Sequence, residues 1–176
     1  MSVASGISVH LMMGCIYLWG NISNYVVSYF HFLGDENASL KNAVLIVPLS
    51  LTLFVGTTPI GAFLQKRYNP KLVILVGVII MITSIYLASI QKTWIGFVLF
   101  YCLGFPFGIG CVYFVPIVCG WEWFPENKGL ISGLTLAGFG FGASIFGYIT
   151  TAIANPDNLK TAIPQDGLGT FEKLFP

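Results

Sequence analysis

Charge is what this sequence has least of. Lys, Arg, Asp and Glu together make up 9% of its 176 residues, whereas an ordinary soluble domain carries about 25% charged residues. All of these side chains stand outside the long apolar runs of the chain. The net charge of +1 provides no basic surplus for nucleic-acid phosphates. The composition therefore excludes an ordinary soluble domain and argues against a nucleic-acid partner.

The sequence also lacks the side-chain groupings that chemistry requires. Its acids are confined to loops, His10 and His31 stand near opposite ends of one apolar run, and no serine lies in a nucleophile-elbow motif. The cysteines have spacings that suit neither a zinc site nor a disulfide framework; they are Cys15, Cys102, Cys111 and Cys119. We therefore predict no catalytic residue, no metal site and no cofactor, and we do not expect an enzyme.

Long apolar runs are what the chain does have. A helix needs about 20 apolar residues to cross a bilayer. The runs are too long for β-barrel strands and do not alternate, and the first lacks the basic start of a signal peptide. These features predict an all-α, multi-pass integral membrane protein, with residues 1–154 as a helical bundle in lipid and 155–176 as a polar, non-cytoplasmic loop or tail. The expected helices lie near residues 3–32, 43–64, 72–90, 95–119 and 130–153.

A cluster of bases sets the expected orientation. Lys66, Arg67 and Lys71 fall in the short turn between the second and third runs. Because cytoplasmic loops carry an excess of Lys and Arg, this turn is predicted to be cytoplasmic. Alternation then places the loop 33–42 outside, and with it the glycosylation tripeptide that begins at Asn37.

The first run carries a polar stripe. Tyr17, Asn21, Asn24 and Ser28 recur at steps of three and four residues, which places them on one helix face. Unpaired amides are costly against lipid, so this face should meet protein or a water-filled cavity. Two interpretations stay open, hydrogen bonding between helices and lining of a solute path. We take the stripe as the candidate substrate path.

The last run is studded with glycine. Gly129 and Gly133, and again Gly138 and Gly142, show the spacing that lets two membrane helices approach backbone to backbone. Gly133, Gly138 and Gly142 are the predicted packing residues. Larger side chains there should separate the facing helices.

The polar turn before this glycine-rich run carries a family resemblance. Its pattern, W-F-P-x-x-[KR]-G, resembles the loop between helices four and five of major facilitator transporters, in the branch of oxalate/formate antiporters and monocarboxylate carriers. The segment 14–19 also resembles the G-x-x-Y-x-W segment of helix one in that branch, where the helix borders the substrate path. The matching residues of the loop are Trp123, Phe124, Pro125, Lys128, Gly129 and Gly133.

The basic turn resembles the signature loop of the same transporters imperfectly. Arg67 and Lys71 align with its basic positions, and Asn69 replaces a glycine because asparagine tolerates the left-handed conformation. Lys66 stands where the family has an acid, and Gly61 is displaced by one position. In the family that acid helps to latch the two halves of the transporter, so the latch is in doubt here.

The resemblance implies a segment of a transporter that moves a small organic anion, such as a monocarboxylate, by alternating access. The expected fold is an incomplete amino-terminal six-helix bundle. Its expected partners are the lipid bilayer, a small-molecule solute, and the missing carboxy-terminal helices or another membrane chain. The alternative is a shortened, non-transporting membrane protein that associates through its small-residue helix faces.

Overall fold

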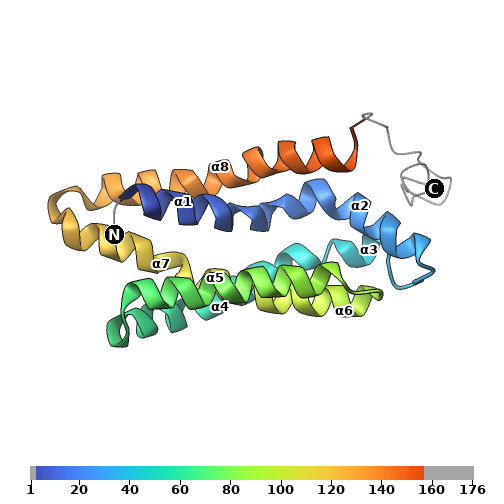
Figure 1. Cartoon of the computed structure of the whole chain (residues 1–176), viewed down its shortest axis with the longest axis horizontal. Coiled ribbons are helices and arrows are strands. Elements are labelled where there is room, and N and C mark those ends of the chain that lie inside the picture. The colour runs from blue at the N-terminus through green and yellow to red at the C-terminus, as the bar shows by residue number, and fades with distance from the viewer. Residues whose placement is uncertain (1–2, 157–176) are drawn as a thin grey trace.

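Five helical segments, each long and apolar enough to cross a membrane, run back and forth along the long axis of the structure (Figure 1). The structure is a computed structural model that describes residues 3–156, and within that range it contains helices and turns but no strand. The predicted all-α membrane fold is therefore confirmed. The predicted tail lies outside the described residues except for Asn155 and Pro156. The segments are Val3–Phe32, Leu40–Arg67, Pro70–Ser89, Trp94–Trp123 and Pro125–Ala154.

Polar caps, rather than the limits of the apolar runs, set where several helices begin. The Ser39 hydroxyl accepts the backbone N–H of Asn42 at 3.2 Å, and Asn69 Oδ1 accepts that of Lys71 at 3.0 Å. Such side chains satisfy backbone donors that a helix start leaves unpaired. The second span therefore begins at Leu40 rather than near residue 43. The fifth begins at Pro125, in the helical turn Pro125–Asn127 (η3), rather than near residue 130.

Two of the spans change their helical winding along their length. The first span consists of α1 (Val3–Met13), a 3₁₀ segment η1 (Gly14–Leu18) and α2 (Trp19–Phe32). The fourth consists of α6 (Trp94–Leu99), a π-helical segment η2 (Phe100–Gly104) and α7 (Phe105–Trp123). The remaining helices are α3 (Leu40–Ala43), α4 (Ile46–Arg67), α5 (Pro70–Ser89) and α8 (Lys128–Ala154).

Helix α7 lies at the centre of the bundle and packs against α4, α5, α1 and α8. Its Ile109, Val112 and Val115 are completely buried. Its glycines admit the neighbouring backbones, since a Cβ on Gly110 would stand 2.7 Å from the Phe54 carbonyl oxygen of α4. A Cβ on Gly108 would stand 2.8 Å from the Gly77 carbonyl oxygen of α5. Close backbone approach of this kind is how helices associate in lipid.

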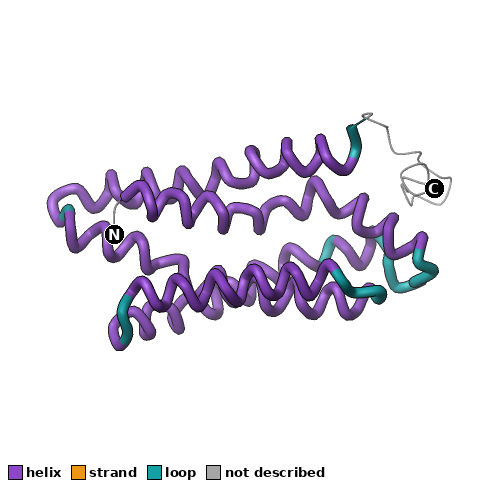
Figure 2. Tube along the Cα trace, viewed as in Figure 1, coloured by secondary structure: helices purple, strands orange, loops and turns teal. Residues whose placement is uncertain are grey.

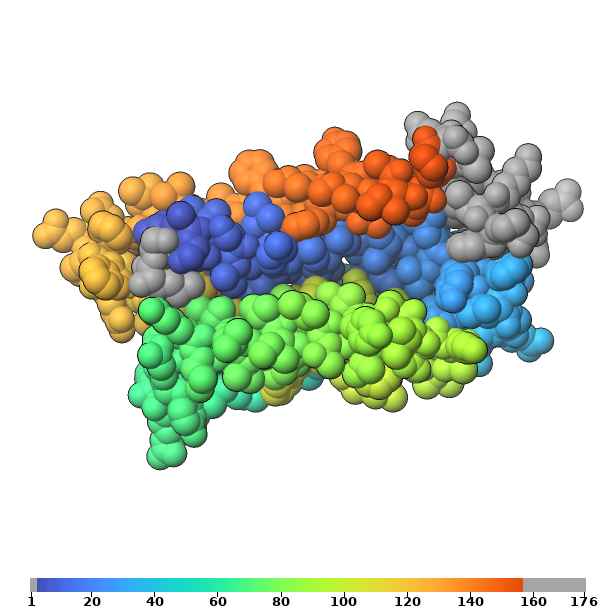
Figure 3. All heavy atoms as spheres, in the orientation of Figure 1, coloured from blue at the N-terminus to red at the C-terminus, as the bar shows by residue number. Residues whose placement is uncertain are grey.

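The first and last spans form a second packed pair. Helix α8 lies along α1, as the space-filling view shows (Figure 3). A Cβ on Gly14 would overlap the Phe139 carbonyl oxygen, and one on Gly142 would overlap that of Leu11. The two glycines face each other, and the contact leaves no room for a side chain at either of these two positions.

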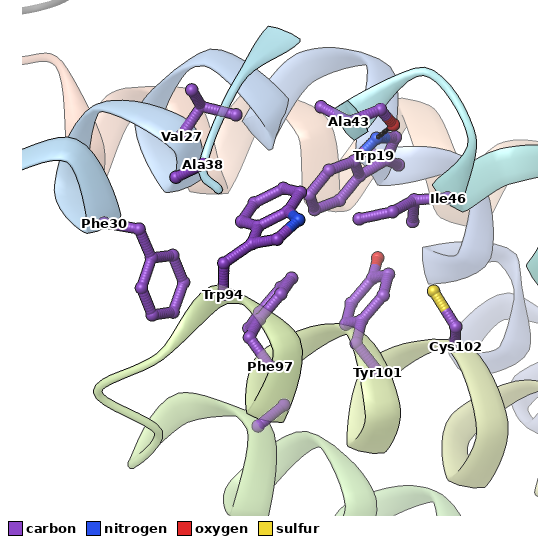
Figure 4. Packing of buried hydrophobic residues seen from close by; sticks show 11 residues of the cluster. Trp19, Val27, Phe30, Ala38, Ala43, Ile46, Trp94, Phe97, Tyr101 and Cys102 are labelled. Atoms are coloured by element: carbon purple, nitrogen blue, oxygen red, sulfur yellow. Dashed lines mark hydrogen bonds between the residues drawn. The ribbon is translucent and has the colours of Figure 1, made fainter. Parts of the chain in front are cut away.

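Aromatic side chains pack together where the first, second and fourth spans meet (Figure 4). Trp19 lies 5.3 Å from Tyr101 and 5.9 Å from Phe97, measured between ring centroids, and its Nε1–H donates to the Ala43 carbonyl at 2.8 Å. We call these rings the aromatic cluster; they are Trp19, Phe30, Trp94, Phe97 and Tyr101. A loop carboxylate reinforces the cluster, because Asp35 Oδ2 accepts the backbone N–H of Trp94 at 2.7 Å.

The turns between the spans fall at the two ends of the bundle (Figure 2). Residues 67–70 and 124–127 lie at the same end as Val3, and the loops 33–39 and 90–93 lie at the other end. This is the alternation that the sequence predicts for membrane-crossing helices. That the basic turn faces the cytoplasm stays a prediction.

Candidate functional site

Two aromatic side chains lie against His10, and two more pack on those two rings. Tyr113 of α7 lies 5.3 Å from His10 between ring centroids, and Phe139 of α8 lies 6.3 Å away. Phe54 of α4 lies 5.0 Å from Tyr113, and Tyr17 of η1 lies 5.4 Å from Phe139. These five residues form the His10 cluster. It joins the first, second, fourth and fifth spans at one place.

The His10 cluster grades from buried to exposed. His10 is fully buried, Phe139 and Phe54 are nearly so, Tyr113 is half-buried, and 48% of Tyr17 is exposed. Aromatic rings with a polar tip suit such a boundary, because the ring packs while the hydroxyl remains accessible. The cluster can therefore expose tyrosine hydroxyl groups at its surface, while the rings beneath them are packed against other side chains.

A groove of about 450 Å³ between α4 and α7 adjoins the cluster. Phe54 and Tyr113 belong to both, and Thr58 and Pro59 lie beside Phe54 in the α4 wall. The Thr58 hydroxyl donates to the carbonyl of Phe54 at 2.9 Å, within its own helix. The volume falls in the range of about 300–1,000 Å³ that small-molecule sites occupy. Tyr113 is then the half-buried polar side chain that stands between this groove and His10.

A larger groove of about 560 Å³ lies between α4 and the α6–η2 segment, and it is a weaker candidate. Its polar residues include Thr52 and Thr57, whose hydroxyls donate to carbonyls of their own helix, at Pro48 and Leu53. The surface left to a ligand is apolar. The Thr58 hydroxyl of the first groove is engaged in the same way, so what distinguishes this second groove is that no tyrosine of the described chain lines it.

The predicted polar stripe does not form one uniform surface. Tyr17 and Asn21 are exposed, Asn24 is half-buried and Ser28 is buried. The Asn21 amide packs on α8, since its Nδ2 lies 2.7 Å from the place of a Cβ on Gly147. Along its length α2 passes from α8 to α3, so residues on one face meet different neighbours. The outer part of the stripe thus resembles an interhelical contact, and Tyr17 is its member in the His10 cluster.

His10 is the residue that sequence reasoning weighted too lightly. A lone histidine near a helix start is read most simply as an end residue, yet the structure buries this one completely. A usable signal was present, because His10 and Tyr17 are seven residues apart and so share a helix face. Its Nδ1 lies 3.2 Å from the Gly6 carbonyl oxygen. Its Nε2 finds no hydrogen-bond partner among residues 3–156.

The resemblance motif of the turn before α8 is mostly exposed. Trp123 is 69% exposed and Phe124 48%. Pro125 begins η3, where a proline costs no hydrogen bond. Trp121, outside the matched positions, holds the turn in place: its Nε1–H lies 2.9 Å from Ser132 Oγ and 3.1 Å from the Lys128 carbonyl.

The basic turn between α4 and α5 combines a close contact with exposed cations. A Cβ on Gly61 would overlap the backbone of Cys111, so this glycine joins α4 to α7. The Arg67 guanidinium lies 5.5 Å from the centroid of the Phe63 ring. Lys71 follows the Asn69 cap at the start of α5. In this structure Gly61 has a packing role that its place in a loop motif did not reveal.

The three predicted packing glycines of α8 separate into two groups. Gly138 and Gly142 face α1, where a Cβ on Gly138 would stand 2.7 Å from the Ile7 carbonyl oxygen. Gly133 differs from the prediction: it is exposed, and no described atom lies within 4 Å of the place of its Cβ. Five residues turn a helix by about 140° beyond one full turn, so Gly133 and Gly138 point to different faces. Gly129 is exposed in the same way.

Metal chemistry has no support in the described part of the chain. Among residues 3–156, no three His, Cys, Asp or Glu side chains are grouped so that they could hold a metal ion. The cysteines there are free thiols. The chemistry that this arrangement offers is hydrogen bonding and aromatic packing.

Comparison with known proteins finds that the chain is similar to transporters. It is 30% identical to the apicoplast pyruvate carrier 1 of Toxoplasma gondii, over 89% of this chain and 35% of that protein. It is 24% identical to the oxalate:formate antiporter of Oxalobacter formigenes, over 90% of this chain and 36% of that protein. The fujikurins efflux protein of Gibberella fujikuroi is 26% identical, over 82% of this chain and 31% of its own length.

The chain spans about a third of the length of the curated relatives it matches. Two further fungal relatives are described as MFS-type transporters. No protein-family model matches the chain. No solved structure matches it either.

Proposed function

We propose that this chain, which is similar to transporters of the major facilitator type, forms one side of the path by which such a transporter moves a small organic anion. The His10 cluster and the adjoining groove carry the proposal. Helices that only packed in lipid would need no half-exposed phenols beside a buried imidazole. The first, second, fourth and fifth spans each contribute a residue to this surface.

A monocarboxylate or a similar small carboxylate is the solute class that we propose. Two of the relatives are called a pyruvate carrier and an oxalate:formate antiporter. The groove of about 450 Å³ is large enough for a solute of that size. Tyr113 lines the groove and Tyr17 contacts Phe139 in the same cluster, and each offers a hydroxyl donor. Every Lys and Arg of the spans lies within a few residues of a span end, so the hydroxyl groups in the middle of the spans can orient an anion but cannot neutralise it.

Alternating access needs a second wall around the solute, because transporters of this kind rock two repeats around a midplane site. We propose that further membrane helices, of the same protein or of another chain, provide that wall. The exposed Gly129 and Gly133 of α8 are a surface on which such helices could approach closely. This keeps the predicted packing role of Gly133 and transfers it to a contact outside residues 3–156.

Uptake of labelled carboxylates into vesicles tests the proposal. Vesicles from cells that express the full gene product should accumulate pyruvate or oxalate, and Tyr17→Phe should lower the apparent affinity by about five- to tenfold, the equivalent of one hydrogen bond. Tyr148→Phe is the matched control, because Tyr148 of α8 is 81% exposed. The assignment would be overturned if the vesicles took up no small carboxylate. It would also be overturned if Tyr17→Phe and Tyr148→Phe reduced uptake equally.

Asn21 separates the two interpretations of the polar stripe. Asn21→Leu removes the amide and keeps an approximate size. If the stripe lines the path, uptake should fall while the amount of protein in the membrane is unchanged or rises, since leucine inserts more easily. The contact of Asn21 with Gly147 favours the other result, in which expression and thermal stability fall first and uptake per folded molecule is preserved.

A further inference from the structure

His10 has one ring nitrogen engaged and the other unpaired. A carbonyl oxygen accepts hydrogen bonds and cannot donate one, so the 3.2 Å contact with Gly6 assigns the proton of the neutral ring to Nδ1. Nε2 then carries a lone pair. It is fully buried and has no partner among the described residues. A buried polar atom without a partner is unfavourable and calls for an explanation.

No permanent charge lies near this nitrogen along the elements that surround it. Residues 3–34, 93–121 and 129–156 contain no Lys, Arg, Asp or Glu. Helix α1 packs against α7, α8 and η1. The titratable side chains that these elements bring near His10 are Tyr113 from α7 and Tyr17 and Cys15 from η1, while α8 presents Thr135 and Phe139. Burial thus disfavours a charge on the ring, backbone groups of Gly6 and Tyr113 favour one, and no neighbouring ion compensates until a charged ligand arrives.

We propose that His10 receives the carboxylate of the solute, and that it takes up one proton as it does so. The proton comes from water and binds Nε2, which then donates it as a hydrogen bond to the anion, while Nδ1–H stays on the Gly6 carbonyl. This inference rests on the proposed function. An anion beside a buried imidazole favours the protonated ring, and the protonated ring favours the anion, so each binds more tightly in the presence of the other.

Tyr113 provides the route between the groove and His10. Its ring contacts His10 and also lines the groove between α4 and α7, and it is only half-buried. Because Tyr113 contacts both, a change in the orientation of its side chain is the step by which we expect Nε2 to reach the groove. The Tyr113 hydroxyl can then hydrogen-bond the same carboxylate, so that one neutral and one charged donor hold it.

Two substitutions of His10 separate binding from packing. Asn places an amide near the position of Nδ1 and removes Nε2, whereas Gln carries a neutral donor toward the position of Nε2. Pyruvate and oxalate are the probes, with binding to the full gene product measured by calorimetry between about pH 5 and 8. Proton uptake is read from the dependence of the heat on the buffer. His31→Asn is the matched control, because His31 is exposed near the other end of the same span.

The expected wild-type result is uptake of up to one proton per anion and an affinity that falls by up to tenfold for each unit rise in pH. His10→Gln should still bind without proton uptake, His10→Asn should bind at least tenfold more weakly, and His31→Asn should behave as the wild type. Binding without proton uptake by the wild type, or proton uptake that persists in both His10 variants, overturns this inference alone. Failure of the wild type to bind either carboxylate overturns the proposed function as well.

Discussion

The two halves of the first span reach their neighbours in opposite ways. In the first half, where α1 passes into η1, Gly14 meets Gly142 of α8 almost backbone to backbone, with the Cβ position of each glycine 3.0 Å from the Cα of the other. In the α2 half, Trp19 and Phe30 meet Phe97 of α6 through tilted rings. Lipid tails are as apolar as leucine, so burial alone does not hold membrane helices together. Close packing holds them together instead. The first half packs closely because glycine has no side chain, and the second half packs closely because large aromatic side chains interlock.

The winding of the helix changes where one packing mode gives way to the other. The 3₁₀ segment η1 begins at Gly14 and ends just before Trp19. A 3₁₀ segment rises further per residue and turns more per residue than an α-helix. The 3₁₀ segment therefore rotates the side-chain directions of α2 relative to those of α1. As a result, one continuous span contacts α8 through a glycine and α6 through a tryptophan.

Gly142→Leu should have the largest effect, because it breaks the glycine-packed half. The new side chain would collide with the Leu11 carbonyl, which belongs to a helix backbone and cannot rotate away. We expect a loss of at least about 3 kcal/mol, the upper range for overpacking of a core, and little folded protein in detergent. Gly140→Leu is the control, since no described atom lies within 4 Å of its Cβ position. Equal thermal unfolding of the two variants would show that the α1–α8 contact is not formed.

Trp19→Ala tests the aromatic half and should have the second largest effect. In water-soluble cores the loss of a buried tryptophan costs about 3–5 kcal/mol. Lipid can solvate part of the exposed apolar surface, so we expect a smaller loss here. Trp19→Phe keeps a ring and removes the hydrogen bond to Ala43, for a loss of about 1 kcal/mol. Thermal unfolding in one detergent ranks the three proteins, and a ranking with phenylalanine below alanine would contradict ring packing as the main contribution.

Asp35→Ala should have a smaller effect that depends on pH. Hydrogen bonds from the backbone N–H of Trp94 and then of Asn37 hold the pKa of Asp35 below its ordinary value. A lowered pKa means that the folded state binds its proton less readily, so the stabilisation is complete above the ordinary pKa of about 3.9 and disappears as the pH falls through the lower value of the folded state. The wild type should therefore unfold at a higher temperature than Asp35→Ala at pH 6, and the difference should shrink on acidification. A constant difference would show that the carboxylate charge is not involved.

Gly133→Leu should change least within this chain. Gly133 is exposed, and the structure places no described atom near its Cβ position. Unfolding of the isolated chain should be unaffected. Assembly with further helices, read by crosslinking between single cysteines in the full gene product, should weaken if the proposed contact exists. A destabilised isolated chain would instead return Gly133 to the α1–α8 interface that the sequence predicted.

The spans and their order could be predicted because each depends on a local property. A run such as 72–90 is apolar on all sides, and lipid requires a helix of about that length whatever its neighbours are. The small-residue pattern likewise identified Gly138 and Gly142. It could not separate them from Gly133, because the spacing marks two faces of α8 and only the position of α1 shows which face is covered in this chain.

The sequence by itself determined that this protein is a bundle of membrane-crossing helices with its charges at the ends, because each peptide group and each charge must be satisfied locally in lipid. Only the tertiary structure decided which side chains meet. Phe54, Tyr113 and Phe139 are far apart in the chain and converge on His10 because α7 crosses between the other spans. The meeting of these side chains depends on how the helices cross, and a local sequence pattern does not predict helix crossings. His10 was therefore visible as a residue of the first span from the start, while its burial and its unpaired nitrogen belong to the fold.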